Sequence, residues 1–202
     1  MPSPRQSLRT AGVAVRAMAV LTVVLGVGYA AVVTGVGQLA LPAQADGSLV
    51  SVDGRVVGSS LIGQSFQDAD GTALPEWFQS RPSAAGDGYD ASASSGSNLG
   101  PENADLVAAI EERKAAIAAS DGVDPATIPA DALTASASGL DPHISPEYAR
   151  LQVARVAGAR DIPDQEVADL VEEHVQGRDL GYLGEPTVNV LELNIALAGL
   201  GG

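Results

Sequence analysis

An uninterrupted apolar segment near the N-terminus constrains this chain more than any other feature. From Ala17 to Ala45 there are 29 residues without a formal charge. The densest part, Ala17–Val36, would span about 30 Å as a helix, which is the thickness of the hydrocarbon core of a bilayer. The sequence therefore predicts a transmembrane helix over residues 17–37, preceded by a short segment, residues 1–16, and followed by one domain, residues 38–202.

The charges on either side of this segment predict its orientation. Arg5, Arg9 and Arg16 precede it, and the first charges after it are Asp46 and Asp53. Because cytoplasmic flanks are enriched in Lys and Arg, we expect the N-terminus in the cytoplasm and the domain outside a cell (inner or plasma) membrane, after a single crossing. The A-x-A tripeptide at 43–45 leaves a cleaved signal peptide as an alternative, although the apolar region of a signal is usually only about 7–15 residues long. Both alternatives place the domain across the membrane.

The rest of the chain is strongly acidic. Residues 46–202 hold eight basic and twenty-five acidic side chains, for a net charge of −17. Such a charge repels phosphate backbones, so we expect no nucleic-acid partner. The sequence contains no cysteine, which excludes a disulfide scaffold, a thiolate nucleophile and any Cys-ligated metal site.

The outer domain has the pattern of a small α+β fold. Strand-like residues around an Asp53-Gly54 pair predict a type I′ hairpin, which Leu61 and Ile62 are expected to extend. The serine- and glycine-rich residues 83–100 are typical of a mobile linker, with an ordered loop as the alternative. Helices are expected over about 101–119, 145–159 and 164–176, the first with Pro101 at its start and the second capped by Ser145. A strand over 187–191 is then followed by a strand or short helix over 192–197.

The chain lacks the familiar catalytic motifs. Its only lysine, Lys114, lies between Arg113 and Ala115, so there is no P-loop, and neither G-x-G-x-x-G nor G-x-S-x-G occurs. We therefore expect no catalytic and no metal site. An anchored hydrolase using His143 with Asp141 and a serine remains the alternative. Otherwise His143 is expected to bond within its turn, and His174 to lie on a solvated helix face.

Three short polar segments, residues 78–83, 96–101 and 140–146, are expected to fix backbone shape instead, because their prolines and glycines restrict or extend the available φ angles. They are suited to a docking surface. Our candidate contact residues are Gln79, Arg81 and Ser83 in the first segment, Ser97 and Asn98 in the second, and Asp141 and His143 in the third.

The same segments carry a family resemblance. The matching motifs are Gly63-Gln64-Ser65-Phe66, WFQSRPSA at 77–84, GSNLGPEN at 96–103, SASGLDPHISPEYARLQVARVAGAR at 136–160, and VNVLELNIAL at 188–197. The chain closely resembles the KdpC subunit family of the bacterial high-affinity potassium-transporting P-type ATPase. The likeness covers the apolar segment and nearly all of residues 47–198.

The resemblance implies a non-catalytic accessory subunit that is needed for assembly and activity. The implied partners are a channel-like subunit that binds and carries potassium, a catalytic subunit that hydrolyses ATP, and a very small membrane peptide. The family is described as a catalytic chaperone that raises the affinity of the catalytic subunit for ATP, so the resemblance also implies ATP binding.

Charge and location lead to a different expectation for ATP. A domain of net charge −17 that lacks a P-loop and lies outside the cytoplasm is poorly suited to bind a nucleotide tetra-anion. We expect any effect on ATP affinity to travel through the membrane helix and the channel-like subunit. The acidity is consistent with two roles, which the sequence leaves open: enrichment of potassium at the mouth of the channel, or solubility alone. A freestanding anchored binding module is a further alternative to the transport role.

Overall fold

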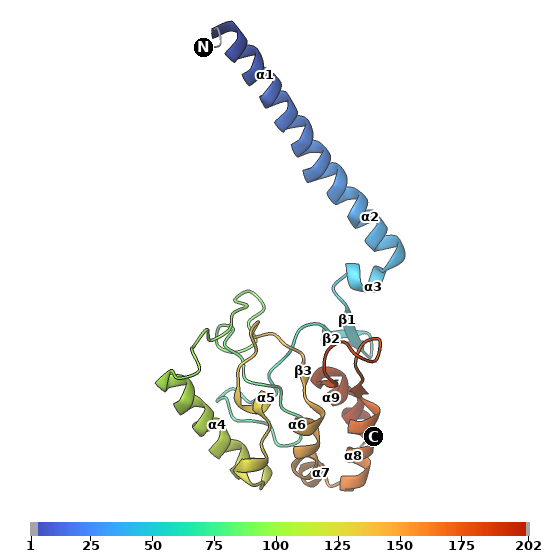
Figure 1. Ribbon diagram of the computed structural model, residues 1–202. Coiled ribbons are helices and arrows are strands. Elements are labelled where there is room, and N and C mark those ends of the chain that lie inside the picture. The colour runs from blue at the N-terminus through green and yellow to red at the C-terminus, as the bar shows by residue number, and fades with distance from the viewer. Residues whose placement is uncertain (1–3, 201–202) are drawn as a thin grey trace. The chain divides into compact units, whose positions relative to one another are not determined.

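The computed structural model describes residues 4–200, and the chain forms two compact units, one up to Leu49 and one from Val50 onward. The second unit mixes short strands with helices, which confirms the predicted α+β class (Figure 1).

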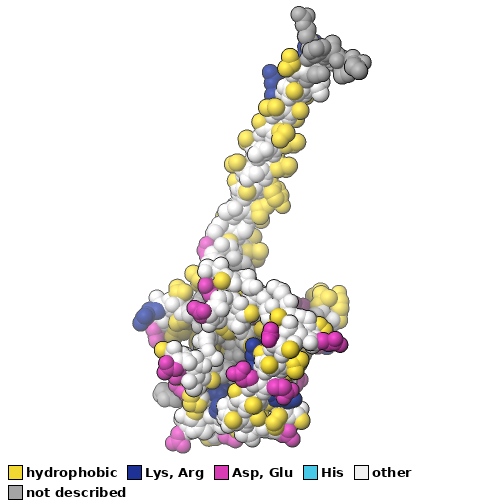
Figure 2. Space-filling view, turned by 90° about the vertical axis from the view of Figure 1, so that its left-hand side faces the viewer, with side chains coloured by type: hydrophobic (Ala, Val, Ile, Leu, Met, Phe, Trp, Pro, Cys, Tyr) yellow, Lys and Arg dark blue, Asp and Glu magenta, His cyan; other side chains and the backbone are white. Residues whose placement is uncertain are grey.

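The N-terminal unit is mainly helical between Pro4 and Ala45. It consists of α1 (Pro4–Leu21), a π-helical segment η1 (Thr22–Tyr29), α2 (Ala30–Ala40) and the short α3 (Pro42–Ala45). Residues Leu8–Ala40 form one apolar stretch of 33 residues, which by length and composition is sufficient to cross a membrane. Hydrophobic side chains cover the visible face of this helix and none of its residues is buried (Figure 2). The predicted transmembrane segment lies inside this stretch.

A β-hairpin begins the second part of the chain. Strands β1 (Leu49–Val52) and β2 (Arg55–Ser59) pair with each other. Asp53 and Gly54 between them have φ angles of 51° and 76°, as a type I′ turn requires. The hairpin prediction is therefore confirmed. The expected continuation at Leu61 and Ile62 is wrong, because the chain turns there and the Ile62 N–H donates to the Ser59 carbonyl at 3.2 Å.

A second sheet joins three very short strands that are far apart in sequence. Its order is β3 (His143–Ile144), β5 (Thr187–Asn189) and β4 (Val175–Gln176), with both pairs antiparallel. His143 lies opposite Asn189, and Val175 lies opposite Val188. The sheet thus fixes the third polar segment, which contains β3, beside the C-terminal part of the chain.

The first helix of the domain, α4 (Ala104–Asp121), begins later than expected. Asn103 is its N-cap, and the Asn103 side chain accepts from the Asp105 N–H at 2.8 Å and from the Leu106 N–H at 3.4 Å. An Asn cap of this kind outweighs the preference of Pro101 for a first helical position, so the predicted start is wrong. Two short helical turns follow, η2 (Pro125–Thr127) and α5 (Ala130–Leu133).

The second predicted helix is correct at its start and interrupted in its middle. Ser145 is the N-cap, as predicted, and its hydroxyl accepts from the Tyr148 N–H at 3.1 Å. The helix then divides into α6 (Pro146–Leu151) and α7 (Val153–Arg160), and Gln152 lies at the junction.

The last two helices bury apolar stripes. In α8 (Asp164–Glu173) the residues Val167, Leu170 and Val171 are buried. The helix ends three residues before the predicted Gln176, because the chain enters β4 there. Strand β5 is likewise shorter than expected, since the Asn189 side chain accepts from the Glu192 N–H and begins α9 (Val190–Gly199). The helical alternative for residues 192–197 is therefore correct.

A single core lies among these helices and the three-stranded sheet, with α4 at the opposite edge of the folded unit from α8 (Figure 1). The long segment between β2 and α4 is irregular, but hydrogen bonds hold it to the rest of the domain. Ser94, for example, donates to the Ser138 carbonyl at 2.9 Å. The structure thus shows the ordered-loop alternative for residues 83–100. The largest fully buried side chains are Phe78, Gln152, Val156, Val167, Val171, Val188, Val190, Leu193, Asn194 and Leu197.

Candidate functional site

Two buried side-chain amides hold the backbone of the first polar segment. Asn194 accepts from the Phe78 N–H at 2.9 Å and donates to the Phe78 carbonyl at 3.0 Å. Gln152 does the same for Gln79, accepting at 2.7 Å and donating at 3.2 Å. Each amide therefore replaces the neighbouring strand that an extended segment would otherwise need, and satisfies polar groups that are costly to bury unpaired. We call Gln152 and Asn194 the amide clamp.

Gln79, a predicted contact residue, is part of the internal framework. Its side-chain nitrogen lies within hydrogen-bond distance of three carbonyl oxygens: 2.9 Å from those of Phe66 and Leu74, and 3.2 Å from that of Trp77. Its side-chain amide therefore links three positions of the same irregular segment and is not directed toward a partner protein.

Arg155 reinforces the same region from α7. It forms an ion pair with Asp121, in which the two side chains are only 8% and 3% exposed. Its guanidinium also donates to the Pro75 carbonyl at 2.6 Å and to the Gln152 side-chain oxygen at 2.6 Å. Because Arg155 bonds one residue of the amide clamp directly, the ion pair and the clamp form one network.

Arg160 covers the only tryptophan of the sequence. Its guanidinium carbon lies 4.4 Å from the centre of a Trp77 ring, in cation–π geometry, and its Nε donates to the Glu76 carbonyl at 2.7 Å. Trp77 also contacts Phe66, with ring centres 6.2 Å apart and ring planes inclined at 33°. The tryptophan therefore contacts both an aromatic ring and a cation.

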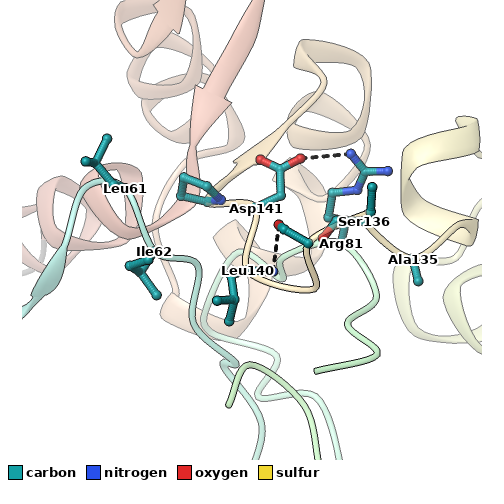
Figure 3. A pocket seen from close by; sticks show the side chains of 10 residues that line it. Leu61, Ile62, Arg81, Ala135, Ser136, Leu140 and Asp141 are labelled. Atoms are coloured by element: carbon teal, nitrogen blue, oxygen red, sulfur yellow. Dashed lines mark hydrogen bonds and ion pairs between the residues drawn. The ribbon is translucent and has the colours of Figure 1, made fainter. Parts of the chain in front are cut away.

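Arg81 of the first segment meets Asp141 and His143 of the third. The Arg81 Nη1 donates to an Asp141 carboxylate oxygen at 2.9 Å, and the two side chains point toward each other in Figure 3. The other oxygen accepts from the His143 backbone N–H at 3.0 Å, and the His143 Nδ1 lies 3.6 Å from it. Burial tends to raise the pKa of Asp141, but the His143 hydrogen bonds and the Arg81 charge outweigh it and lower that pKa below its ordinary value.

Ser83 and Tyr89 close the turn that follows. The Ser83 hydroxyl donates to the Gly139 carbonyl at 2.6 Å and accepts from the Tyr89 N–H at 2.9 Å. The Tyr89 hydroxyl in turn donates to the Arg81 carbonyl at 2.6 Å. Burial raises the pKa of Tyr89 to about 12, so this phenol remains a neutral donor at any physiological pH.

The Arg81–Asp141 pair also lines two cavities. A cavity of about 720 Å³ is lined by both residues, by Ser136, and by Leu61 and Ile62 across from them (Figure 3). Within residues 4–200, the Arg81 Nε and the Ser136 Oγ are buried without a hydrogen-bond partner. A second cavity, of about 570 Å³, is lined by Arg81, Asp141 and His143.

Ser97 and Asn98, the second segment, differ from the other five candidates. Both residues are exposed, and across the described part of the chain neither bonds with those five. Asn98 has a φ of 52°, and its side chain donates to the Gly96 carbonyl at 3.1 Å. The structure therefore brings Gln79, Arg81, Ser83, Asp141 and His143 into one connected region and leaves the second segment on the surface.

The histidines show no catalytic arrangement over residues 4–200. No serine hydroxyl is hydrogen-bonded to the ring of His143 or His174 there, and no group of three His, Asp or Glu side chains is placed to hold a metal ion. The His143 backbone N–H bonds to Asp141 within the turn, and its ring Nδ1 lies 3.6 Å from the same carboxylate. The solvated face predicted for His174 is wrong, because its Nδ1 lies 2.8 Å from the Leu170 carbonyl oxygen and the residue is half-buried.

The residues that sequence reasoning missed are Gln152, Arg155, Arg160 and Asn194. A signal for two of them exists in the sequence. Gln152 and Asn194 are polar residues within apolar stretches, LQVARV and LELNIAL, and a polar residue on a buried helix face requires an internal partner. The sequence does not say which segment supplies that partner.

Comparison with known proteins identifies the family of the chain. The profile described as "KdpC: K+-transporting ATPase, c chain" matches residues 11–199. A protein of Kineococcus radiotolerans named "Potassium-transporting ATPase KdpC subunit" is 60% identical over 190 residues, which cover 94% of this chain and 93% of the relative. Proteins of the same name from Caulobacter vibrioides and Nitratidesulfovibrio vulgaris are 56% and 57% identical, over 89% and 86% of this chain and 88% and 86% of their own lengths. The described motifs and this similarity along nearly the whole sequence establish that the chain belongs to the KdpC family.

Proposed function

We propose that this chain is a non-catalytic accessory subunit of an ATP-driven potassium importer. Its membrane helix crosses the bilayer once, with the N-terminus in the cytoplasm, and its acidic domain lies outside. The partners are the channel-like potassium-binding subunit, the P-type ATPase catalytic subunit and a small membrane peptide. The names of its relatives support the potassium-transport role, and the charge asymmetry around the helix supports the orientation.

One observation carries the non-catalytic role. Three side chains of the first polar segment donate to carbonyl oxygens or to an aspartate of their own domain. Gln79 donates to carbonyl oxygens of Phe66, Leu74 and Trp77, Ser83 to the Gly139 carbonyl, and Arg81 to Asp141. A catalytic acid, base or nucleophile needs a free atom directed toward a substrate. These groups are used to hold backbone shape, which is what a docking scaffold needs.

The effect on ATP affinity, in this proposal, is indirect. Acidic side chains are scattered over the visible face of the domain, and they repel a nucleotide tetra-anion (Figure 2). Coupling through the membrane helix requires no nucleotide site outside. Titration of the full chain with ATP in detergent should show no saturable binding at micromolar concentrations, and tight saturable binding would refute the indirect route.

The acidity supports a further element of the proposal, a local enrichment of potassium. Negative charge near a channel mouth raises the local cation concentration, with screening beyond about 8 Å at physiological salt. Replacing several exposed carboxylates on α4, such as Glu111 and Glu112, by glutamine should raise the apparent Michaelis constant for potassium at low salt. An unchanged constant would leave solubility as the role of the charge.

Complementation tests the accessory role. A strain that lacks only its own KdpC subunit is grown at micromolar potassium with the cognate partner subunits, with and without this chain. Growth with the chain, and none without it, is expected. The matched control is growth at millimolar potassium, where both strains should grow equally. Failure of rescue with the chain present in the membrane would overturn the proposal in favour of a freestanding binding module.

A further inference from the structure

The β1–β2 hairpin and the turn that follows it expose large apolar side chains. Leu49 is 59% exposed, Val56 60% and Leu61 59%. Leu61 lies two residues after the end of β2, and its N–H donates to the Ser59 hydroxyl at 3.2 Å, so it stays beside the end of that strand. Single exposed apolar residues are common on protein surfaces, but a group of them indicates an interaction surface. We call Leu49, Val56 and Leu61 the hairpin surface.

Other residues of the hairpin attach it to the domain. Val52 and Val57 line an apolar cavity of about 280 Å³ together with residues of α9. The Gln64 side chain donates to the Val57 carbonyl at 2.8 Å, and the Asn189 side chain donates to the Ser60 carbonyl at 2.8 Å. The hairpin surface is therefore presented by a fixed element, without the ordering cost that a mobile loop would have to meet on binding.

The charge of this stretch differs from that of the rest of the domain. Residues 47–67 contain one acidic and one basic side chain, Asp53 and Arg55, so their net charge is zero. Asp46 and residues 68–202 therefore supply the whole net charge of −17. Anionic lipid headgroups repel negative charge over about 8 Å at physiological salt, and a neutral stretch escapes this repulsion. An apolar surface within a neutral stretch is suited to a lipid interface.

The covalent connection keeps the hairpin close to the membrane. The apolar helix ends at Ala40 and β1 begins at Leu49, with α3 between them. Nine fully extended steps would span about 30 Å, and the helical turn of α3 reduces this reach to about 25 Å. A surface tethered this closely to a bilayer has a high effective concentration there, so even a weak affinity for lipid is sufficient for contact.

We propose that the hairpin surface lies on the outer leaflet of the bilayer, with Leu49, Val56 and Leu61 at the boundary between headgroups and acyl chains. This inference rests on the proposed single crossing with the domain outside. Arg55, which is exposed at the turn of the hairpin, pairs with a lipid phosphate. The domain thereby gains a second attachment to the membrane beside its helix, which restricts how it can rotate about the tether.

Spin labelling tests the contact directly, because the sequence contains no cysteine and a single introduced one is labelled uniquely. The full chain with Val56→Cys carries a nitroxide and is reconstituted alone in phosphatidylcholine vesicles. Collisions with oxygen report the acyl region, and collisions with a water-soluble nickel chelate report the aqueous phase. Val107→Cys on α4 is the matched control, because Val107 is also apolar and 49% exposed. The ratio of oxygen to nickel collisions should be several-fold higher at position 56 than at position 107.

Three results would overturn the lipid contact. Equal ratios at the two positions would place the hairpin surface in water. Low collision rates with both probes at position 56 would mean that protein, here a second copy of the chain, covers it. Loss of oxygen access when the other subunits are reconstituted with the chain would mean that a subunit covers it in the complex. Flotation separates these results from a failure of the proposed function: a chain that does not float with the vesicles lacks the membrane crossing, and both proposals then fall.

A second variant tests the role of Arg55. Arg55→Glu is added to the labelled Val56→Cys chain, and the ratio is measured in vesicles with and without phosphatidylglycerol. The new negative charge should lower the ratio at position 56 toward that of the control, and more strongly in the anionic vesicles. An unchanged ratio in both kinds of vesicle would overturn the pairing of Arg55 with phosphate.

Discussion

The segment Phe78–Ser83 and the segment Gly96–Pro101 are both short polar motifs, and they have opposite structural roles. In the first, Phe78 is fully buried and the backbone is bonded to the side chains of Gln152 and Asn194. In the second, Ser97 and Asn98 are exposed and the Asn98 side chain bonds within its own turn. A family motif can therefore mark either a scaffold or a surface, and the two are distinguished by the partners of the side chains.

This difference separates stability from function. We call the first segment and the side chains that hold it, including the amide clamp, Arg155 with Asp121, and Trp77 with Arg160, the scaffold. Substitutions in the scaffold should destabilise the folded domain and so reduce activity indirectly. Substitutions on the surface should leave the fold intact and reveal docking. Unfolding of the full chain in detergent can be followed by the fluorescence of Trp77, the only tryptophan, which lies within the scaffold.

Arg155→Met should destabilise the domain most, by about 3–5 kcal/mol, because it leaves the buried Asp121 carboxylate without its charged partner. Denaturant unfolding measures the change. The double variant Arg155→Met with Asp121→Asn should recover part of the loss, since no buried charge then remains unpaired. If the single variant were as stable as wild type, the scaffold would not depend on this pair.

Asn194→Ala tests the amide clamp. The substitution leaves the buried Phe78 N–H and carbonyl without partners, and each unpaired group costs about 1–3 kcal/mol, so we expect a loss of at least about 2 kcal/mol. The same denaturant titration applies. Glu192→Ala, on the same helix but only half-buried, is a control that should cost less than about 1 kcal/mol. Equal effects of the two substitutions would contradict a specific role for the clamp.

Asp141→Asn should cost about 1 kcal/mol at pH 7, with a defined pH dependence, because the pair with Arg81 is partly exposed. The folded state lowers the pKa of Asp141 from its ordinary value of 3.8, so the folded state binds its proton less readily than the unfolded chain does. The stabilisation is therefore complete above that ordinary value and is lost as pH falls through the lowered pKa. Thermal unfolding from about pH 7 to about pH 2 should show the difference between wild type and variant shrinking toward acid, and a constant difference would rule out ionisation as its cause.

Ser97→Ala and Asn98→Gly should change stability by no more than about 0.5 kcal/mol, because both side chains are exposed and glycine accepts the φ of 52° at position 98. Any loss of growth at micromolar potassium would then report docking. Ser136→Ala is a matched small substitution at a buried position outside the scaffold and should be neutral or stabilising, since it removes a buried hydroxyl that has no partner in the described structure. A large loss of stability in the surface variants would remove the contrast between the segments.

The sequence predicted most of the local structure and little of the connection between elements. The Asp53-Gly54 turn and the Ser145 cap were correct because both depend on a few neighbouring residues. The start at Pro101 and the end at Gln176 were wrong because a stronger cap, Asn103, and a strand pairing decided those boundaries.

The site was predicted in part for a similar reason. Turn chemistry and the family motifs identified Arg81 and Asp141 as notable residues, but not as partners 60 positions apart. Gln152 and Asn194 were missed because an amide within an apolar helix is consistent with many partners until the chain is folded. Their targets lie 73 and 116 positions away along the sequence.

Those two separations have a consequence for the order in which the domain is made. The Phe78 N–H and carbonyl cannot take their native partners until Asn194, 116 positions later, has been synthesised. Contacts this distant carry a large loop-closure entropy and form late. In the proposed orientation, the central segment must therefore stay unfolded on the far side of the membrane until α9 has been synthesised. A chain truncated before α9 should then be degraded, however much of its earlier sequence is intact.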